Sequence, residues 1–261
     1  MSATARLPWA LLACASLLAC TGDDEVTPDA SQPLIDSGTP DGPGEDVEDL
    51  CPGELTFEAL VLDLESDAAV FEVSVAQVGD ESNAATSAPN GRAVLCLPDE
   101  AGAVRSTKEE YLARLDRVDP EAVRALAATA TPYPLHVIGA AAFDELLAGV
   151  GVTPDDDAGH VVVTVLAAAD GQPVTGATVA LDKTHGGAFA RDDSGALAAG
   201  DEIGSGGLVL LANVELAGGG PPGEVEVTVT LPGDFEGTGT CRSNTGDLEA
   251  GALTGVVVVC E

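Results

Sequence analysis

The sequence of 261 residues predicts a mainly β fold: two Greek-key-like β-sandwich modules, the first with a short helical insertion, after a disordered acidic tether. Three observations predict it. From residue 55 onward, apolar and polar residues alternate with the period of two that is typical of strands with one buried face. Glycine and proline separate these segments at the spacing of sandwich strands. The first fifty residues lack this alternation and hold a short apolar run followed by an acidic stretch.

Residues 1–19 have the layout of a secretory signal peptide. Arg6 precedes the apolar run Leu7–Ala19, which is too short to span a bilayer, and small residues lead up to Cys20. The sequence LLAC at positions 17–20 resembles a bacterial lipobox. This resemblance implies that Cys20 carries a lipid, becomes the mature N-terminus and attaches the protein to a membrane.

Two alternatives to lipidation at Cys20 remain open. A second LLAC ends at Cys14, but cleavage there would leave only Leu7–Ala13 as the apolar run, so we favour Cys20. An ordinary signal peptide with an incidental cysteine is the other alternative. Thr21 follows the lipid site. An aspartate at this position would resemble the signal that retains enterobacterial lipoproteins in the inner membrane, so the threonine favours the outer membrane of a bacterial cell envelope.

The chain is strongly acidic, with a formal net charge of -34. This excludes a nucleic-acid partner, because a phosphate backbone needs a positive face to replace its counterions. Residues 21–50 contain ten acidic residues, four prolines and no lysine or arginine. Such a segment cannot bury enough apolar surface to offset the entropy of ordering, so residues 20–50 are predicted to be a disordered tether.

Four cysteines remain beyond the signal and the lipid site: Cys51, Cys96, Cys241 and Cys260. An even number in an exported chain, without a CxxC motif, indicates two disulfides rather than a zinc site. Three pairings are possible, and we favour Cys51 with Cys96 and Cys241 with Cys260. Cys241 and Cys260 both end strand-like stretches, with a turn-rich segment between them, so they can meet across neighbouring strands.

Residues 51–157 and 158–261 are predicted to form the two modules. Glu224–Leu231 alternates without a fault, and Phe71–Val75 alternates in the same way. Val161–Leu166 and Val256–Val259 are near-continuous apolar runs, which suit strands covered on both faces. These patterns place about seven strands in the second module, the size of one sandwich.

The helical insertion of the first module is predicted from two segments. Glu109–Ala128 has a partly helical pattern that Pro120 breaks, and Phe143–Val150 has the pattern of a second short helix. Asp155–Asp157 then forms an acidic joint, where we place the boundary between the modules.

Five segments of the second module resemble the carboxypeptidase regulatory-like, transthyretin-like sandwich. They are Gly159–Val163, Asp170–Val174, Gly176–Val179, Gly206–Leu210 and Asn213–Val214. In the first module, Thr86–Pro98 is similar to the same fold over a shorter stretch. The resemblance implies a β-sandwich that accompanies carboxypeptidases and by itself implies no catalysis.

No catalytic, metal or cofactor residues are predicted. His136, His160 and His185 are not part of HxxE or HExxH, and no serine lies in a GxSxG elbow. His160, at a strand start, is expected to be a structural histidine. Asp155–Asp157, or Asp192 and Asp193 with Asp201 and Glu202, could supply oxygen ligands to calcium, but neither set has the spacing of a calcium loop. A metal-dependent enzyme is the least favoured alternative.

The sequence therefore predicts a non-enzymatic, lipid-anchored envelope protein that presents its modules to an unknown envelope protein or glycan. The segment from Lys183 to Gly207 is long, glycine-rich and acidic, and is expected to be a loop that contacts the partner. The contact residues expected there are Lys183, His185, Phe189 and Arg191. A glycan-binding module is the main alternative, although aromatic residues are scarce. Phe189 and Tyr111 are the aromatics expected to be exposed, whereas Phe71 and Phe235 are expected in the core.

Overall fold

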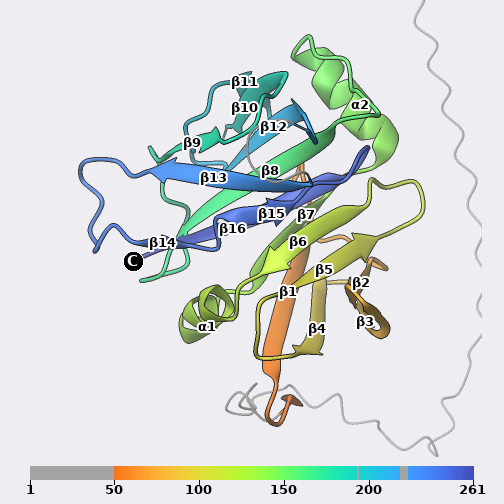
Figure 1. Cartoon of the computed structure of the whole chain (residues 1–261), viewed down its shortest axis with the longest axis vertical. Coiled ribbons are helices and arrows are strands. Elements are labelled where there is room, and N and C mark those ends of the chain that lie inside the picture. Colours follow the sequence, from red (N-terminus) through yellow and green to blue (C-terminus); the bar gives the residue numbers. More distant parts are fainter. Residues whose placement is uncertain (1–49, 193, 218–222) are drawn as a thin grey trace, which may run out of the picture. The chain divides into compact units, whose positions relative to one another are not determined.

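Three β-sheets and two helices build the part of the chain that the structure describes (Figure 1). The structure, a computed structural model, describes residues 50–261 except 193 and 218–222. The predicted signal peptide, the lipid site at Cys20 and all of the tether except Leu50 lie outside these residues. The mainly β fold class is confirmed.

The elements follow one another along the chain with short connections. The strands are β1 (Leu55–Asp63), β2 (Ser74–Gln77), β3 (Asp80–Thr86), β4 (Arg92–Leu97), β5 (Gly102–Thr107), β6 (Arg114–Val118), β7 (Tyr133–Val137), β8 (Gly159–Ala167), β9 (Thr178–Leu181), β10 (Gly187–Arg191), β11 (Leu197–Ala199), β12 (Leu208–Val214), β13 (Glu224–Thr230), β14 (Cys241–Arg242), β15 (Thr245–Asp247) and β16 (Leu253–Cys260). The helices are α1 (Pro120–Ala128) and α2 (Ala140–Gly149).

One large sheet runs through the whole described region in the order β11-β10-β12-β8-β16-β6-β5-β2-β3, with β14 pairing to β16. Two small sheets pack on it, β4-β1-β7 and β15-β13-β9. β16 is parallel to both β8 and β6, so it joins strands from the two predicted modules. The predicted boundary at residues 157/158 lies in the turn before β8, and the division into two modules stays a prediction.

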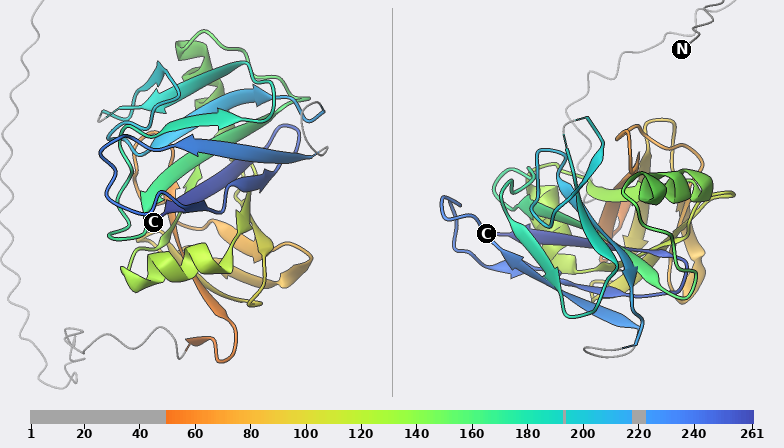
Figure 2. Two further views of the ribbon diagram at one scale, coloured as in Figure 1. Left: turned by 60° about the vertical axis from the view of Figure 1, so that its left-hand side comes forward. Right: turned by 90° about the horizontal axis from the view of Figure 1, so that it is seen from above.

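β16 is buried on both faces, as its continuous apolar sequence predicts. Val256 and Val258 pack into the core beneath β13, whereas Val257 and Val259 pack into the core beneath β1. β8 has the same character and is buried along nearly its whole length. Figure 2 shows β13 lying across the face of β8 and β16. The two small sheets therefore cover opposite faces of the same central strands.

The first helical prediction is wrong in its first half and right in its second. Residues Arg114–Val118 form β6, and α1 begins at Pro120 instead of being broken by it. The reason is local: Asp119 is extended, its carboxylate accepts a hydrogen bond from the Glu121 N–H, and proline suits the first helical position. The second predicted helix is confirmed as α2.

The pattern at Phe71 also misleads, because β2 begins only at Ser74 and Phe71 is 45% exposed. The Ser87 hydroxyl donates to the carbonyl of Val70 and accepts from the N–H of Val73. Glu72 between them has a φ of 60°. This kink interrupts the period of two and turns Phe71 outward while its valine neighbours stay in the core.

Both favoured disulfides are present. Cys51 pairs with Cys96 at a Cα–Cα distance of 5.3 Å, and Cys241 pairs with Cys260 at 4.0 Å. The first joins the start of the folded region to β4. The second joins β14 to the end of β16, and its two cysteines are register partners in the antiparallel pairing of these strands.

Candidate binding cleft

An open cleft with a volume of about 470 Å³ lies where β1, β7 and β8 meet the loops that follow β1, β8 and β10. Leu60 and Leu62 of β1 are register partners of Pro134 and His136 of β7, so these four side chains share one face. Leu166 of β8 and Pro173 extend the same apolar lining. The two sheets thus provide an apolar floor beneath loops that carry charge.

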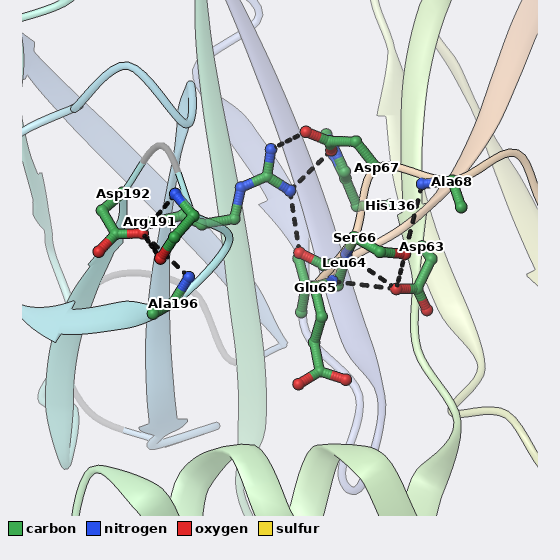
Figure 3. Close-up of polar contacts among 11 residues, drawn as sticks. Asp63, Leu64, Glu65, Ser66, Asp67, Ala68, His136, Arg191, Asp192 and Ala196 are labelled. Carbon is green, nitrogen blue, oxygen red and sulfur yellow. Dashed lines mark hydrogen bonds and ion pairs between the residues drawn. The ribbon is translucent and has the colours of Figure 1, made fainter.

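Arg191 at the end of β10 is the central polar residue of the cleft and is only 5% exposed. Figure 3 shows its guanidinium reaching across to the loop after β1. One terminal nitrogen donates to the Leu64 carbonyl at 3.0 Å and to one Asp67 oxygen at 2.6 Å. The other donates to the second Asp67 oxygen. This two-pronged pair fastens the β1 loop to β10.

His136 completes this cluster from β7. Its Nε2 lies 3.4 Å from an Asp67 carboxylate oxygen. Burial lowers the pKa of His136 by more than the hydrogen bond with Asp67 raises it, so the imidazole is neutral near pH 7. Burial raises the pKa of Asp67, but the hydrogen bonds from His136 and Arg191 outweigh this effect and lower that pKa to about 2.

A second ion pair lies behind His136 and is completely buried. Arg114 and Asp116, both on β6, form two hydrogen bonds of 2.7 Å, and the Arg114 guanidinium also donates to the His136 carbonyl at 2.6 Å. The space for this pair exists because Gly255 of β16 has no side chain. A Cβ at that position would lie 1.8 Å from an Asp116 oxygen and 2.1 Å from an Arg114 nitrogen.

The wall of the cleft depends on a close approach between two distant loops. Gly195 has a φ of 85°, and a Cβ there would lie 2.2 Å from the Glu65 carbonyl oxygen. Only glycine allows both this backbone conformation and this approach. Gly195 of the 183–207 segment therefore serves a structural purpose at the cleft.

The accessible charge of the cleft is negative. Glu65 and Asp192 are exposed, and the Asp67 side chain is 49% exposed. Three buried atoms among the lining residues have no hydrogen-bond partner: Nδ1 of His136, the Thr164 hydroxyl and Nε of Arg191. Thr164 lies on β8 two residues before Leu166, so both side chains face the cleft.

Only part of the expected contact loop reaches this cleft. The 183–207 segment is not one long loop, because β10 and β11 form within it and pair beside β12. Phe189 is 5% exposed and packs in the core near α2, so the expectation that it is exposed is wrong. Lys183 is also buried and His185 is partly buried. Arg191 alone of the four lies in the cleft.

Sequence reasoning missed the partners of Arg191. Asp67 and His136 lie far apart in the sequence and in no motif, and only the pairing of β1 with β7 brings them together. The structural interpretation of His160 is supported: its Nδ1 accepts a hydrogen bond from the Asn213 N–H at 3.2 Å, and its ring packs edge-on against Phe143.

Among the described residues, no three His, Cys, Asp or Glu side chains are arranged to hold a metal ion. Within the same residues, no helix has the length and apolar character needed to cross a membrane.

Comparisons with known proteins give little guidance. No family model matches the chain, and no curated protein matches it. Among solved structures, the Bacillus anthracis TIE protein is 12% identical over 80% of this chain and 34% of its own, with a TM-score of 0.24. This chain thus spans about a third of that protein.

Two further solved structures are pilins. The minor pilin of Streptococcus agalactiae is 11% identical over 79% of this chain and 96% of its own, with a TM-score of 0.25. A shaft pilin of Lactobacillus rhamnosus GG is 10% identical over 79% of this chain and 98% of its own, with a TM-score of 0.24. At these TM-scores the likeness carries no argument about function.

Proposed function

We propose that this chain is an exported, lipid-anchored protein of the bacterial cell envelope, and that its β unit is a non-catalytic module that binds an envelope partner. The observation that carries the proposal is the pair of disulfides in the folded region. Stable disulfides belong to oxidising compartments outside the cytoplasm. They agree with the signal layout and the lipobox-like LLAC that ends at Cys20.

The position of the first disulfide suits an anchored module. Cys51 stands where the acidic N-terminal segment enters the fold, and its bond to Cys96 joins that point to the end of β4. A pull on the N-terminal segment would otherwise peel β1 away from β4, starting at Leu55 and Leu97. With the disulfide in place, the load passes into two strands of the sheet at once.

The cleft supports the binding part of the proposal. Its volume falls within the range of ordinary ligand sites, about 300–1,000 Å³. Its polar groups come from three separate segments around Arg191, Asp67 and His136, which hold each other in place before any partner arrives. Such preorganisation favours recognition.

The experiment expresses the full chain in a bacterium with two membranes and analyses the mature protein by mass spectrometry and membrane fractionation. We expect a lipid on Cys20 and recovery in the outer-membrane fraction. Cys20→Ser should abolish the lipid and release the protein, whereas the matched variant Cys14→Ser should change neither. A lipid on Cys14, or an unlipidated mature chain, would refute the anchor.

Glycan binding is the second candidate, and one surface favours it. Phe71 is 45% exposed, and the Lys108 ammonium donates to its carbonyl at 2.8 Å while lying 5.0 Å from the Tyr111 ring centre. An exposed aromatic beside a held cation resembles the stacking platforms that bind sugars. Glycan-array binding that Phe71→Ala removes, and that Val94→Ala on the outer face of β4 does not, would favour this candidate.

A further inference from the structure

We infer that the cleft binds the side chain of a lysine residue presented by a peptide segment of the partner. This inference rests on the proposed function as a binding module and names the chemistry that the cleft recognises. It is carried by the shape of the cleft, by the sign of its accessible charge, and by its unpartnered polar atoms.

The shape of the cleft suits a long aliphatic side chain. Leu60, Leu62 and Pro134 line it from the small sheet, and Leu166 and Pro173 line it from the large sheet and the following loop. Lysine carries four methylene groups between its backbone and its charge, and such stems pack along apolar surfaces while the charged end stays near polar groups. A short charged side chain would leave this lining uncovered.

The charge of the cleft selects a cation. Glu65, Asp67 and Asp192 present carboxylates at its surface, whereas the guanidinium of Arg191 is buried and already engaged by Asp67. With a neutral His136, the lining carries two more negative charges than positive ones. An anionic ligand would meet carboxylates at the surface and a cation that is no longer free to pair with it.

The polar atoms of the cleft that lack hydrogen-bond partners favour an ammonium group among the possible cations. His136 donates through Nε2 towards Asp67, so its Nδ1 is an acceptor without a donor, and the Thr164 hydroxyl also lacks a partner. An ammonium group brings three donors that can reach separate acceptors. Among the described residues that line the cleft, Arg191 also carries a donor, Nε, without an acceptor. A peptide carbonyl next to the lysine side chain would supply it.

Lysine fits this arrangement better than arginine or calcium does. A guanidinium binds best through a fork to a well-held carboxylate, but both oxygens of Asp67 already receive Arg191, so arginine could form its fork only with the exposed carboxylates of Glu65 or Asp192. Calcium needs six to eight oxygen ligands, and no described cluster of acidic groups could provide them. A compact ammonium needs only scattered acceptors.

The test titrates the full-length purified chain with three capped amino acids by isothermal calorimetry: Nα-acetyl-lysine N-methylamide, its norleucine analogue and its glutamate analogue. We expect saturable binding of the lysine compound, binding of the uncharged norleucine compound weaker by about tenfold or more, and no binding of the glutamate compound. Absence of saturable lysine binding, or equal binding of norleucine, would overturn the inference.

Variants locate the binding in the cleft. Glu65→Gln combined with Asp192→Asn removes two exposed charges and keeps the oxygen that accepts the Ser194 hydrogen bonds, and it should weaken lysine binding by about tenfold. The matched control, Asp80→Asn with Glu81→Gln on β3, removes the same charge outside the cleft and should leave affinity unchanged. Equal affinities of the two double variants would refute the site.

Thr164→Val supplies a second measurement that does not depend on charge. If the Thr164 hydroxyl has only a structural role, Thr164→Val will bind the lysine compound as tightly as the native chain does. That result would count against the inference. Loss of lysine binding together with a retained unfolding midpoint would support it. If lysine does not bind in the cleft, the proposed lipid anchor can still be tested separately, because lipidation of Cys20 is read from the mass of the mature chain.

Discussion

Replacing Gly255 by alanine is expected to break the buried ion pair and destabilise the folded unit severely. The new Cβ would lie 1.8 Å from an Asp116 oxygen, whereas Cβ atoms essentially never approach closer than 3.0 Å, so the two must separate by about 1.2 Å. A displacement of this size breaks the 2.7 Å hydrogen bonds between Arg114 and Asp116.

The expected cost follows from the complete burial of both charges. Breaking a buried pair so that a charge stays uncompensated costs about 3–5 kcal/mol, and forced overpacking alone costs about 1–3 kcal/mol. We therefore expect Gly255→Ala to lower the free energy of unfolding by about 4 kcal/mol. For a chain of this size, this loss corresponds to a decrease in Tm of about 8–16 °C.

The assay is urea unfolding of the two proteins side by side, followed by circular dichroism. Gly149→Ala is the matched control, because Gly149 ends α2 and has no atom within 4 Å of the added Cβ. It should leave stability unchanged or raise it by about 0.5–1 kcal/mol. A Gly255→Ala variant within about 1 kcal/mol of the native chain would refute the reasoning.

Three further outcomes are expected. Replacing Cys51 and Cys96 by serine should lower stability by about 4 kcal/mol, against about 3 kcal/mol for the second disulfide, because the closed loops span 45 and 19 residues; urea unfolding of each variant measures this. Burial lowers the pKa of His160 from 6.5 to about 4, so the unfolded chain binds the extra proton and stability should fall by on the order of 2 kcal/mol as pH decreases from 6.5 to 4. His160→Asn, which keeps an acceptor for Asn213, should unfold with a shallower pH dependence, and an unchanged dependence would contradict the assignment. Urea unfolding of the native chain should show one transition by all probes, since Leu253–Cys260 belongs to both cores; separate transitions for the two halves would contradict this.

The strands whose pattern repeats without interruption could be predicted from the sequence. Glu224–Thr230 alternates between buried and exposed positions as expected, and Val256–Val259 is covered on both faces. These predictions succeed because, in such strands, burial of one face or of both faces determines which positions are apolar. The prediction at Phe71 fails because a hydrogen bond from a residue distant in the sequence, Ser87, bends the chain and overrides the pattern.

The cleft was less accessible to prediction than the strands. Arg191 stood among the expected contact residues, but its surroundings were expected to be a loop, whereas it lies at the end of β10, a strand paired on both sides. Asp67 and His136 gave no local signal, since the parallel pairing of β1 with β7 determines that they meet. The requirement for glycine at 195 and 255 likewise depends on contacts with residues far away in the chain.

The shared strand β16 explains why the two halves of the described region should depend on each other. Val257 and Val259 support the core beneath β1, and Val256 and Val258 support the core beneath β13, so neither core is complete without the last strand. The Cys241–Cys260 bond fixes the end of that strand to β14. A partner bound in the cleft, which β1, β7 and β8 line, would stabilise the folded state, and because β16 joins the two cores, both cores would share this gain in stability.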